Sequence, residues 1–261
     1  MTNIRNALMQ AAGTAASGGS VYVEDVFSTF LYTGNNTAGN AINNGLDLSG
    51  EGGLVWIKAR NATDNPCLFD TERGVTKFVS SGNNNAESTD ANSLTSFNNN
   101  GFTLGTGWTI ASVNYTYDYA SWSFRKQAGF FDVVKFSTTG GGGTQAVSHS
   151  LGSIPGFIII KKTSAAQSWF TFHKSVTSPN SNWWRNFSDL TTAAFDDYFS
   201  DDSAINSAPT ATTVTLGSYF TGGTADYVMY VFAEGGSDDQ IFGDDGDEAI
   251  IKTGSLTTDG N

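Results

Sequence analysis

The sequence predicts an all-β protein built from tandem antiparallel β-sandwich modules, preceded by a short N-terminal helix. Three observations lead to this prediction: the composition, the apolar runs that end at glycine, and an internal repeat. Charged residues make up only 15% of the 261 residues, whereas aromatic residues reach 13% and there are 30 glycines. This composition is typical of many short strands joined by polar turns.

The apolar patterns indicate strands rather than helices. Residues 157–160 are apolar at every position, as expected of a central strand that is covered on both faces. In residues 119–124, the side with Ala120, Trp122 and Phe124 is plainly more apolar than the other, which favours a strand with one exposed face. No clean helical period lies between such runs, so a sandwich is favoured over a βαβ fold. Jelly-roll connections remain an open alternative, and the strand order stays undetermined.

The chain repeats itself with a period that suits one sandwich domain. Alternating runs open at Phe27 and at Phe131, 104 residues apart. Matching blocks follow in the same order: 53–58 and 156–161, 67–70 and 169–173, 101–105 and 213–217, and 119–125 and 227–233. The repeat predicts four parts: an assembly segment at 1–24, sandwich modules at 25–128 and 129–235, and, at 236–261, an acidic linker with the first strand of a further repeat.

The N-terminal segment has the period of a short amphipathic helix. Ile4, Leu8 and Ala12 are spaced four residues apart and therefore share one face. Because so short a helix is marginally stable alone in water, we expect these residues to dock on a partner subunit or to self-associate. A frayed tail is the alternative. No apolar stretch approaches the length of a membrane span, so no membrane insertion is expected.

Charge and cysteine content exclude several classes of function. The net charge of −12 repels a phosphate backbone, so nucleic-acid binding is disfavoured. Cys67 is the only cysteine, which excludes an intrachain disulfide and thiolate zinc sites. Neither His149 nor His173 lies in a metal-binding spacing, and both are interpreted as structural. We expect no metal and no cofactor.

Several runs carry a resemblance to a known group of proteins. They are 25–35 (DVFSTFLYTGN), 45–58 (GLDLSGEGGLVWIK) and 121–126 (SWSFRK), with 131–134 and 151–156 in the second unit. These runs resemble repeat-containing, tail-fibre-like virion proteins of marine bacteriophages. The resemblance implies a structural virion protein that is assembled in the host cytoplasm, forms homo-oligomers and contacts other virion proteins through its N-terminal segment. It leaves the position open between tail fibre, tail base and capsid surface.

Aromatic residues give the alternative function, a carbohydrate- or receptor-binding adhesion module or a capsid decoration protein. The candidate binding residues are Trp169, Trp183, Trp184 and Arg185. Because neighbouring residues of a strand point to opposite faces, one of the two adjacent tryptophans is expected to face outward. An exposed indole can stack on a host glycan or anchor a protein interface. Burial of both is the competing interpretation.

Enzyme chemistry has little support in the sequence. A Gly-x-Ser-x-Gly nucleophile elbow is missing. Glycoside hydrolysis is the strongest enzymatic rival because it needs only two carboxylates on a rigid scaffold. Candidates are abundant in so acidic a chain, and abundance alone does not indicate a pair: Asp70, Glu72, Asp196, Asp197, Asp201 and Asp202. We therefore name no catalytic residue and predict a non-enzymatic protein.

Overall fold

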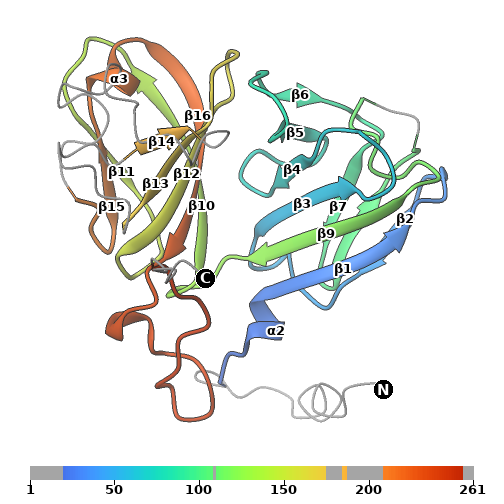
Figure 1. Cartoon of the computed structure of the whole chain (residues 1–261), viewed down its shortest axis with the longest axis horizontal. Coiled ribbons are helices and arrows are strands. Elements are labelled where there is room, and N and C mark those ends of the chain that lie inside the picture. Colours follow the sequence, from blue (N-terminus) through green and yellow to red (C-terminus); the bar gives the residue numbers. More distant parts are fainter. Residues whose placement is uncertain (1–19, 108–109, 175–183, 187–207, 255–261) are drawn as a thin grey trace, which may run out of the picture.

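The structure, a computed structural model, describes residues 20–107, 110–174, 184–186 and 208–254 (Figure 1). The prediction of an all-β, sandwich-like fold is confirmed, and all strand pairs among the described residues are antiparallel. The helices of this part of the chain are single turns: α2 (Val23–Val26), α3 (Ser218–Thr221) and the 3-10 turn η1 (Ser237–Asp239).

The first half of the molecule is a sandwich of two sheets. The large sheet has the order β1-β9-β3-β4-β5-β6, and the small sheet has the order β2-β8-β7. The strands are β1 (Phe27–Thr33), β2 (Asn40–Asn43), β3 (Gly53–Ala59), β4 (Cys67–Asp70), β5 (Lys77–Ser80), β6 (Ser88–Thr89), β7 (Leu94–Asn98), β8 (Gly101–Leu104) and β9 (Asp118–Arg125).

A hydrophobic core fills the space between these two sheets. Val55 and Ile57 of the large sheet pack in one cluster with Phe102 and Leu104 of the small sheet, and all four are almost completely buried. Successive strand residues point to opposite faces. Leu54 accordingly points away from this core, and it is also buried. Strand β3, in the middle of the large sheet, is therefore covered on both of its faces.

The second half is built in the same way. Its large sheet has the order β10-β16-β12-β13-β14, and β11 pairs with β15. Ile158 and Ile160 pack in one buried cluster with Val214 and Leu216. The strands are β10 (Phe131–Thr139), β11 (Gln145–Ser148), β12 (Pro155–Lys162), β13 (Phe170–His173), β14 (Trp184–Asn186), β15 (Thr213–Leu216) and β16 (Thr224–Ala233).

The two halves share one strand plan. The order β1-β9-β3-β4-β5 of the first half recurs as β10-β16-β12-β13-β14 in the second, and β2-β8 recurs as β11-β15. The register recurs as well, because Phe27 pairs with Phe124 and Phe131 pairs with Phe232. Each strand described in the second half thus has a counterpart in the first half, which has β6 and β7 in addition.

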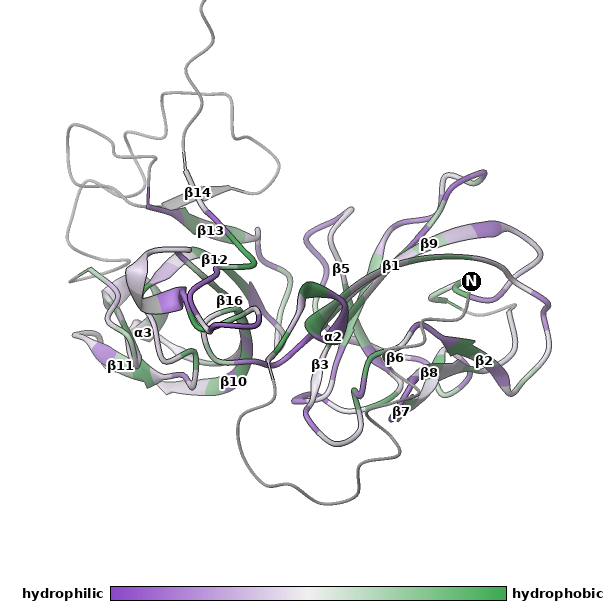
Figure 2. Cartoon of the chain, turned by 90° about the horizontal axis from the view of Figure 1, so that it is seen from below, coloured by the Kyte–Doolittle hydropathy of each residue, from purple (hydrophilic) through white to green (hydrophobic). Residues whose placement is uncertain are grey.

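A third hydrophobic core lies between the halves. It is formed by the outward faces of the two large sheets, with Leu54 and Leu68 from the first half and Val133 and Val228 from the second. Seen from below, the halves stand side by side with α2 between them (Figure 2), and Val26 of α2 is fully buried in this cluster. The outward faces are apolar because they form this contact.

Phenylalanines fill the third core where the chain passes from β9 to β10. The ring of Phe124 lies 5.5 Å from that of Phe131 and 5.5 Å from that of Phe232, and the latter two rings are 4.9 Å apart. Aromatic pairs at such separations stabilise a fold by roughly 0.5–1.5 kcal/mol each beyond the area they bury. The connection between the halves is therefore packed, not a free hinge.

A buried polar cluster sits within this apolar contact. Nε of Arg73 donates to Asp70 Oδ2 at 2.6 Å, and Nη2 of Arg73 donates to the carbonyl oxygen of Leu68 at 2.9 Å. From the other half, the Tyr230 hydroxyl donates to Asp70 Oδ2 at 2.9 Å. Burial by itself lowers the pKa of Arg73, but Tyr230 and Asp70 raise it more, so the guanidinium stays charged. The cluster links the two halves through paired polar groups.

The segment after β16 differs from the predicted solvated linker and further strand. Phe242 is fully buried in the third core, and Asp239 is 1% exposed and accepts hydrogen bonds from two backbone amides. Residues 248–254 form no strand, and only an isolated bridge joins Glu248 to Phe242. Among the described residues of this segment, Phe242, Ile250 and Ile251 pack on the existing sandwiches.

The N-terminal end of the described chain meets the segment that follows β16 at the base of the molecule. The Tyr22 hydroxyl hydrogen-bonds the Asp244 carboxylate, and the amide of Gly243 donates to the carbonyl oxygen of Val21 at 3.1 Å. Figure 1 shows α2 and the C-terminal segment together below the two sandwiches. The predicted docking residues Ile4, Leu8 and Ala12 lie outside the described residues. No helix in the described ranges is long and apolar enough to cross a bilayer.

Replacing Arg73 with methionine tests how much the buried cluster stabilises the molecule. Arg73→Met leaves the Asp70 carboxylate buried without its cation, so we expect the free energy of unfolding to fall by about 3–5 kcal/mol. Chemical denaturation monitored by tryptophan fluorescence measures it. Lys77→Met is the matched control, because Lys77 lies 3.6 Å from Glu87 but its side chain is 41% exposed. The control should lose less than about 1 kcal/mol. Equal losses of unfolding free energy in the two variants would show that the buried cluster does not stabilise the molecule more than an exposed ion pair does.

Candidate functional site

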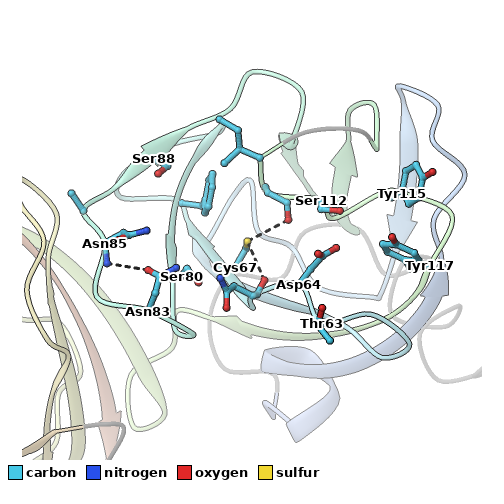
Figure 3. A pocket seen from close by; sticks show the side chains of 15 residues that line it. Thr63, Asp64, Cys67, Ser80, Asn83, Asn85, Ser88, Ser112, Tyr115 and Tyr117 are labelled. Atoms are coloured by element: carbon cyan, nitrogen blue, oxygen red, sulfur yellow. Dashed lines mark hydrogen bonds between the residues drawn. The ribbon is translucent and has the colours of Figure 1, made fainter.

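A pocket of about 500 Å³ opens in the first half, at the edge of the large sheet where β3 ends and β9 begins (Figure 3). Three loops line it, and Cys67, Phe78 and Ala111 form its buried floor. The loops are β3–β4, β5–β6 and β8–β9, which meet because β3 ends and β9 begins at this edge of the large sheet. Strand β1 spans about 20 Å between α2 and this edge, at ~3.3 Å per residue.

The pocket lining is polar and neutral apart from one carboxylate. Asp64 supplies that carboxylate, and the part of the lining that the structure describes contains no lysine, arginine or histidine. Figure 3 shows Tyr115 and Tyr117 at one end, Asn83 and Asn85 at the other, and Asp64 between them. The remaining polar lining residues are Thr63, Asn65, Ser80, Ser88 and Ser112. Hydroxyl and amide groups both donate and accept, so the lining matches a ligand with many hydroxyl groups.

Buried Asn114 fixes the loop that carries the two tyrosines. Its side-chain amide donates to the carbonyl oxygens of Gly105 at 2.6 Å and Thr37 at 3.0 Å, and its Oδ1 accepts from Asn40 Nδ2 at 2.7 Å. Gly107 is required beside it, since a Cβ there would come within 2.2 Å of the Asn114 carbonyl oxygen. Asn114 therefore ties the β8–β9 loop to the start of that loop and to the β1–β2 region.

Two inner tyrosines support the same loop from below. The rings of Tyr32 and Tyr119 stack with centroids 5.0 Å apart. The Tyr32 hydroxyl donates to the Val113 carbonyl oxygen at 2.7 Å, and the Tyr119 hydroxyl donates to that of Ser112 at 2.8 Å. Burial raises the pKa of Tyr119 to about 12, and it also raises the pKa of Tyr32. Both hydroxyls thus remain protonated donors at neutral pH.

The thiol of Cys67, on the pocket floor, has low reactivity. Burial, together with the nearby carboxylates of Asp64 and Asp90, raises the pKa of Cys67 to about 12. Because the thiolate is the nucleophile, a thiol with this pKa reacts slowly at neutral pH. Within the described residues, no three His, Cys, Asp or Glu side chains are grouped so that they could hold a metal ion. The pocket can offer hydrogen bonds and aromatic contacts.

Trp169 supports the pocket from behind and is not presented as a binding platform. It is 5% exposed and lies in the third core. Its indole nitrogen donates to the carbonyl oxygens of Ser80 at 3.2 Å and Asn83 at 3.0 Å, both in the pocket lining. A residue of the second half thereby holds the β5–β6 loop of the first half. The alternation of apolar residues did not indicate this role.

Lys161 holds the same loop from the second half. It is fully buried, and its ammonium donates to the carbonyl oxygens of Asn84 at 3.0 Å and Gln167 at 2.6 Å. Its Nζ also lies 5.9 Å from the centre of the Trp169 ring. Burial lowers the pKa of Lys161 to about 8, and the neighbouring charge of Lys162 lowers it too.

The other predicted binding residues take no identified part in the pocket. Trp183 lies outside the described residues. Trp184 and Arg185 belong to β14, whose backbone pairs with Phe172 and Thr171 of β13 in the second half. Among the described strands, β14 lies at the edge of the large sheet of the second half.

The candidate carboxylates that the structure describes, and His149, form ion pairs or hydrogen bonds with neighbouring groups. Asp70 is bound to Arg73, and Glu72 accepts from Lys126 at 2.9 Å. His149 is buried, which lowers its pKa, and its Nδ1 accepts a hydrogen bond from the Leu151 amide. Asp196, Asp197, Asp201 and Asp202 lie outside the described residues.

Removing the indole N–H of Trp169 should loosen the pocket loop. Trp169→Phe keeps an aromatic ring but leaves two carbonyl oxygens without this donor, which should cost about 1–3 kcal/mol of unfolding free energy. Hydrogen–deuterium exchange should become faster in residues 81–87 and stay unchanged in β8. Trp122→Phe, in the same large sheet as β5 but away from this loop, is the control. Unchanged exchange in residues 81–87 would show that Trp169 does not hold the loop.

The stability of the protein should depend on the protonation of Lys161. Its folded-state pKa of about 8 lies below the usual 10.5, so between these values the unfolded chain retains a proton that the folded chain has lost. Stability contributed by this group therefore rises with pH from about 8 to 10.5. The difference in unfolding free energy between the natural chain and Lys161→Met should grow in favour of the natural chain across this window. A constant difference would contradict the prediction.

Comparison with known proteins places the chain in a family. No curated protein and no solved structure matches it. One family model does match, over residues 23–238, which run from α2 through both sandwiches to η1. The matched region thus contains the pocket, the third core and the residues of the second half that hold the pocket loop. The chain belongs to the family DUF7483, described as a domain of unknown function.

Proposed function

We propose that the chain is a structural component of a bacteriophage virion, a tail-fibre or fibre-like protein attached through its N-terminal segment. The third core carries the proposal, because it joins two sandwiches into one packed unit with Phe131 and Phe232 at the junction. A projecting virion part must transmit force without bending at its joints, and a buried apolar contact resists bending better than a linker. The resemblance of 25–35, 45–58 and 121–126 to tail-fibre-like proteins supports the same assignment.

The position of the N-terminal end of the described chain supports attachment at one end. Tyr22 and Asp244 lie together at the base, and the pocket opens at the far edge of the first half. A subunit held through residues 1–24 would present the pocket away from its attachment point. The proposed partners are other virion proteins and further copies of this chain, with assembly in the host cytoplasm.

Particle composition and oligomeric state test this function. The full-length protein should copurify with phage particles and form oligomers in light scattering. A variant with Ile4→Asp and Leu8→Asp should fold, because both positions precede α2, but should lose particle association. Asp247→Asn, on an exposed residue, is the control. A natural chain that is monomeric and missing from particles would refute the proposal.

The pocket favours a second candidate function, adhesion to a host glycan or receptor. Its volume of about 500 Å³ falls within the range of ligand sites, ~300–1,000 Å³. Adsorption of the purified protein to host cells separates this function from a purely structural one. If adhesion depends on the pocket, Asn85→Ala should reduce adsorption. If it depends on the second half, Trp183→Ala with Trp184→Ala should do so instead.

A further inference from the structure

We propose that the pocket of the first half binds a neutral saccharide of one or two rings. This proposal rests on the adhesive function above and names its ligand class. It follows from the charge of the lining, the arrangement of its polar and aromatic groups, and the rigidity of its loops.

The charge of the lining selects against anions. Among the described residues of the lining, Asp64 alone carries a formal charge at neutral pH, and it is partly buried between the tyrosine end and the asparagine end. A carboxylate or phosphate on the ligand would be repelled by Asp64 without a compensating cation, in a chain of net charge −12. A sugar hydroxyl, in contrast, can donate to this carboxylate, and such charge-assisted hydrogen bonds are the strong ones.

The polar groups match a polyol. Asn65, Asn83 and Asn85 each carry both a donor and an acceptor, as do the serine and threonine hydroxyls of the lining. Each hydroxyl group of a sugar also donates and accepts, so it can donate to one lining group and accept a hydrogen bond from another. A predominantly apolar ligand would take water away from these groups without offering hydrogen bonds in return, which is costly.

The pocket lining also offers apolar surface that a sugar ring can contact. The rings of Tyr115 and Tyr117 meet nearly edge to face, with centroids 4.9 Å apart and planes at 68°. Ile110, a lining residue, is 79% exposed. A pyranose has an apolar C–H face and a polar rim, so it can contact Tyr117 or Ile110 while its hydroxyls reach Asp64 and the asparagines.

The pocket is assembled before any ligand arrives. Asn114 holds the β8–β9 loop, and Trp169 and Lys161 hold the β5–β6 loop from the second half. The amide of Glu87 adds a backbone hydrogen bond to the Thr163 carbonyl oxygen at 3.0 Å. Binding to a preformed site avoids the entropic cost of ordering loops, which matters for ligands as small as sugars.

Titration of the full-length protein with matched sugars tests the proposal. The neutral probes are methyl glycosides of glucose, galactose, mannose and N-acetylglucosamine, with lactose and cellobiose; the acidic probes are glucuronic, galacturonic and N-acetylneuraminic acids. Saturation-transfer NMR detects binding, and calorimetry gives Kd. At least one neutral probe should bind, and the acidic probes should bind at least about tenfold more weakly.

Variants assign the binding to this pocket. Asp64→Asn preserves shape but removes the charge, so it should weaken neutral binding by about tenfold or more. The same variant should narrow the gap between neutral and acidic probes. Asn85→Ala changes an exposed residue and should weaken binding severalfold without affecting the fold. Asp247→Asn removes an equal charge at the base and should change nothing.

The outcomes separate this proposal from the adhesive function. Neutral binding that survives both Asp64→Asn and Asn85→Ala would overturn the pocket assignment. Preferential binding of acidic sugars or of short peptides would overturn the ligand class and leave adhesion standing. Host-cell adsorption by a protein that binds no sugar would also overturn the saccharide proposal alone. A protein that shows no sugar binding and no adsorption to host cells would refute both the saccharide proposal and the adhesive function.

Discussion

Packing the outward faces of two large sheets against each other places Asp70, Arg73 and Tyr230 at the centre of an apolar contact. Each of these groups would be unfavourable there alone, and together they satisfy most of one another's hydrogen bonds. The same contact brings Trp169 and Lys161 of one sandwich against the loop that lines the pocket of the other. Separation of the halves would therefore expose the third core and release that loop at once.

Much of the fold could be predicted from the sequence because strand patterning is local. The alternation and glycine-rich turns around Phe27 and Phe131 indicated strands, and the order of the matching blocks agrees with the order of β1, β3, β4, β8 and β9 and their counterparts. The continuous apolar run at 157–160 correctly indicated a strand covered on both faces. It could not indicate that one cover is the other sandwich, because an apolar outward face does not identify its partner.

The candidate site was harder to predict, for a physical reason. Its residues come from loops near 63–65, 80–88 and 110–117, which converge only after the large sheet has formed. Asparagine, serine and tyrosine in such loops look like ordinary turn composition. Trp169 drew attention as an aromatic side chain near a polar loop, but its indole hydrogen bonds depend on the contact between the halves. The C-terminal segment was misjudged because its many acidic residues obscured Phe242, which is fully buried.

The shared strand plan has a consequence for how longer assemblies could be constructed. The two contacting faces are not equivalent, since Asp70 of β4 occupies the place that His173 holds in β13, each opposite the matching residue of β3 or β12. The outward face of each large sheet is nevertheless buried against the other in the third core, so this contact joins two sandwiches and leaves neither face for a third. Growth into a filament or a ring would have to use surfaces other than this one.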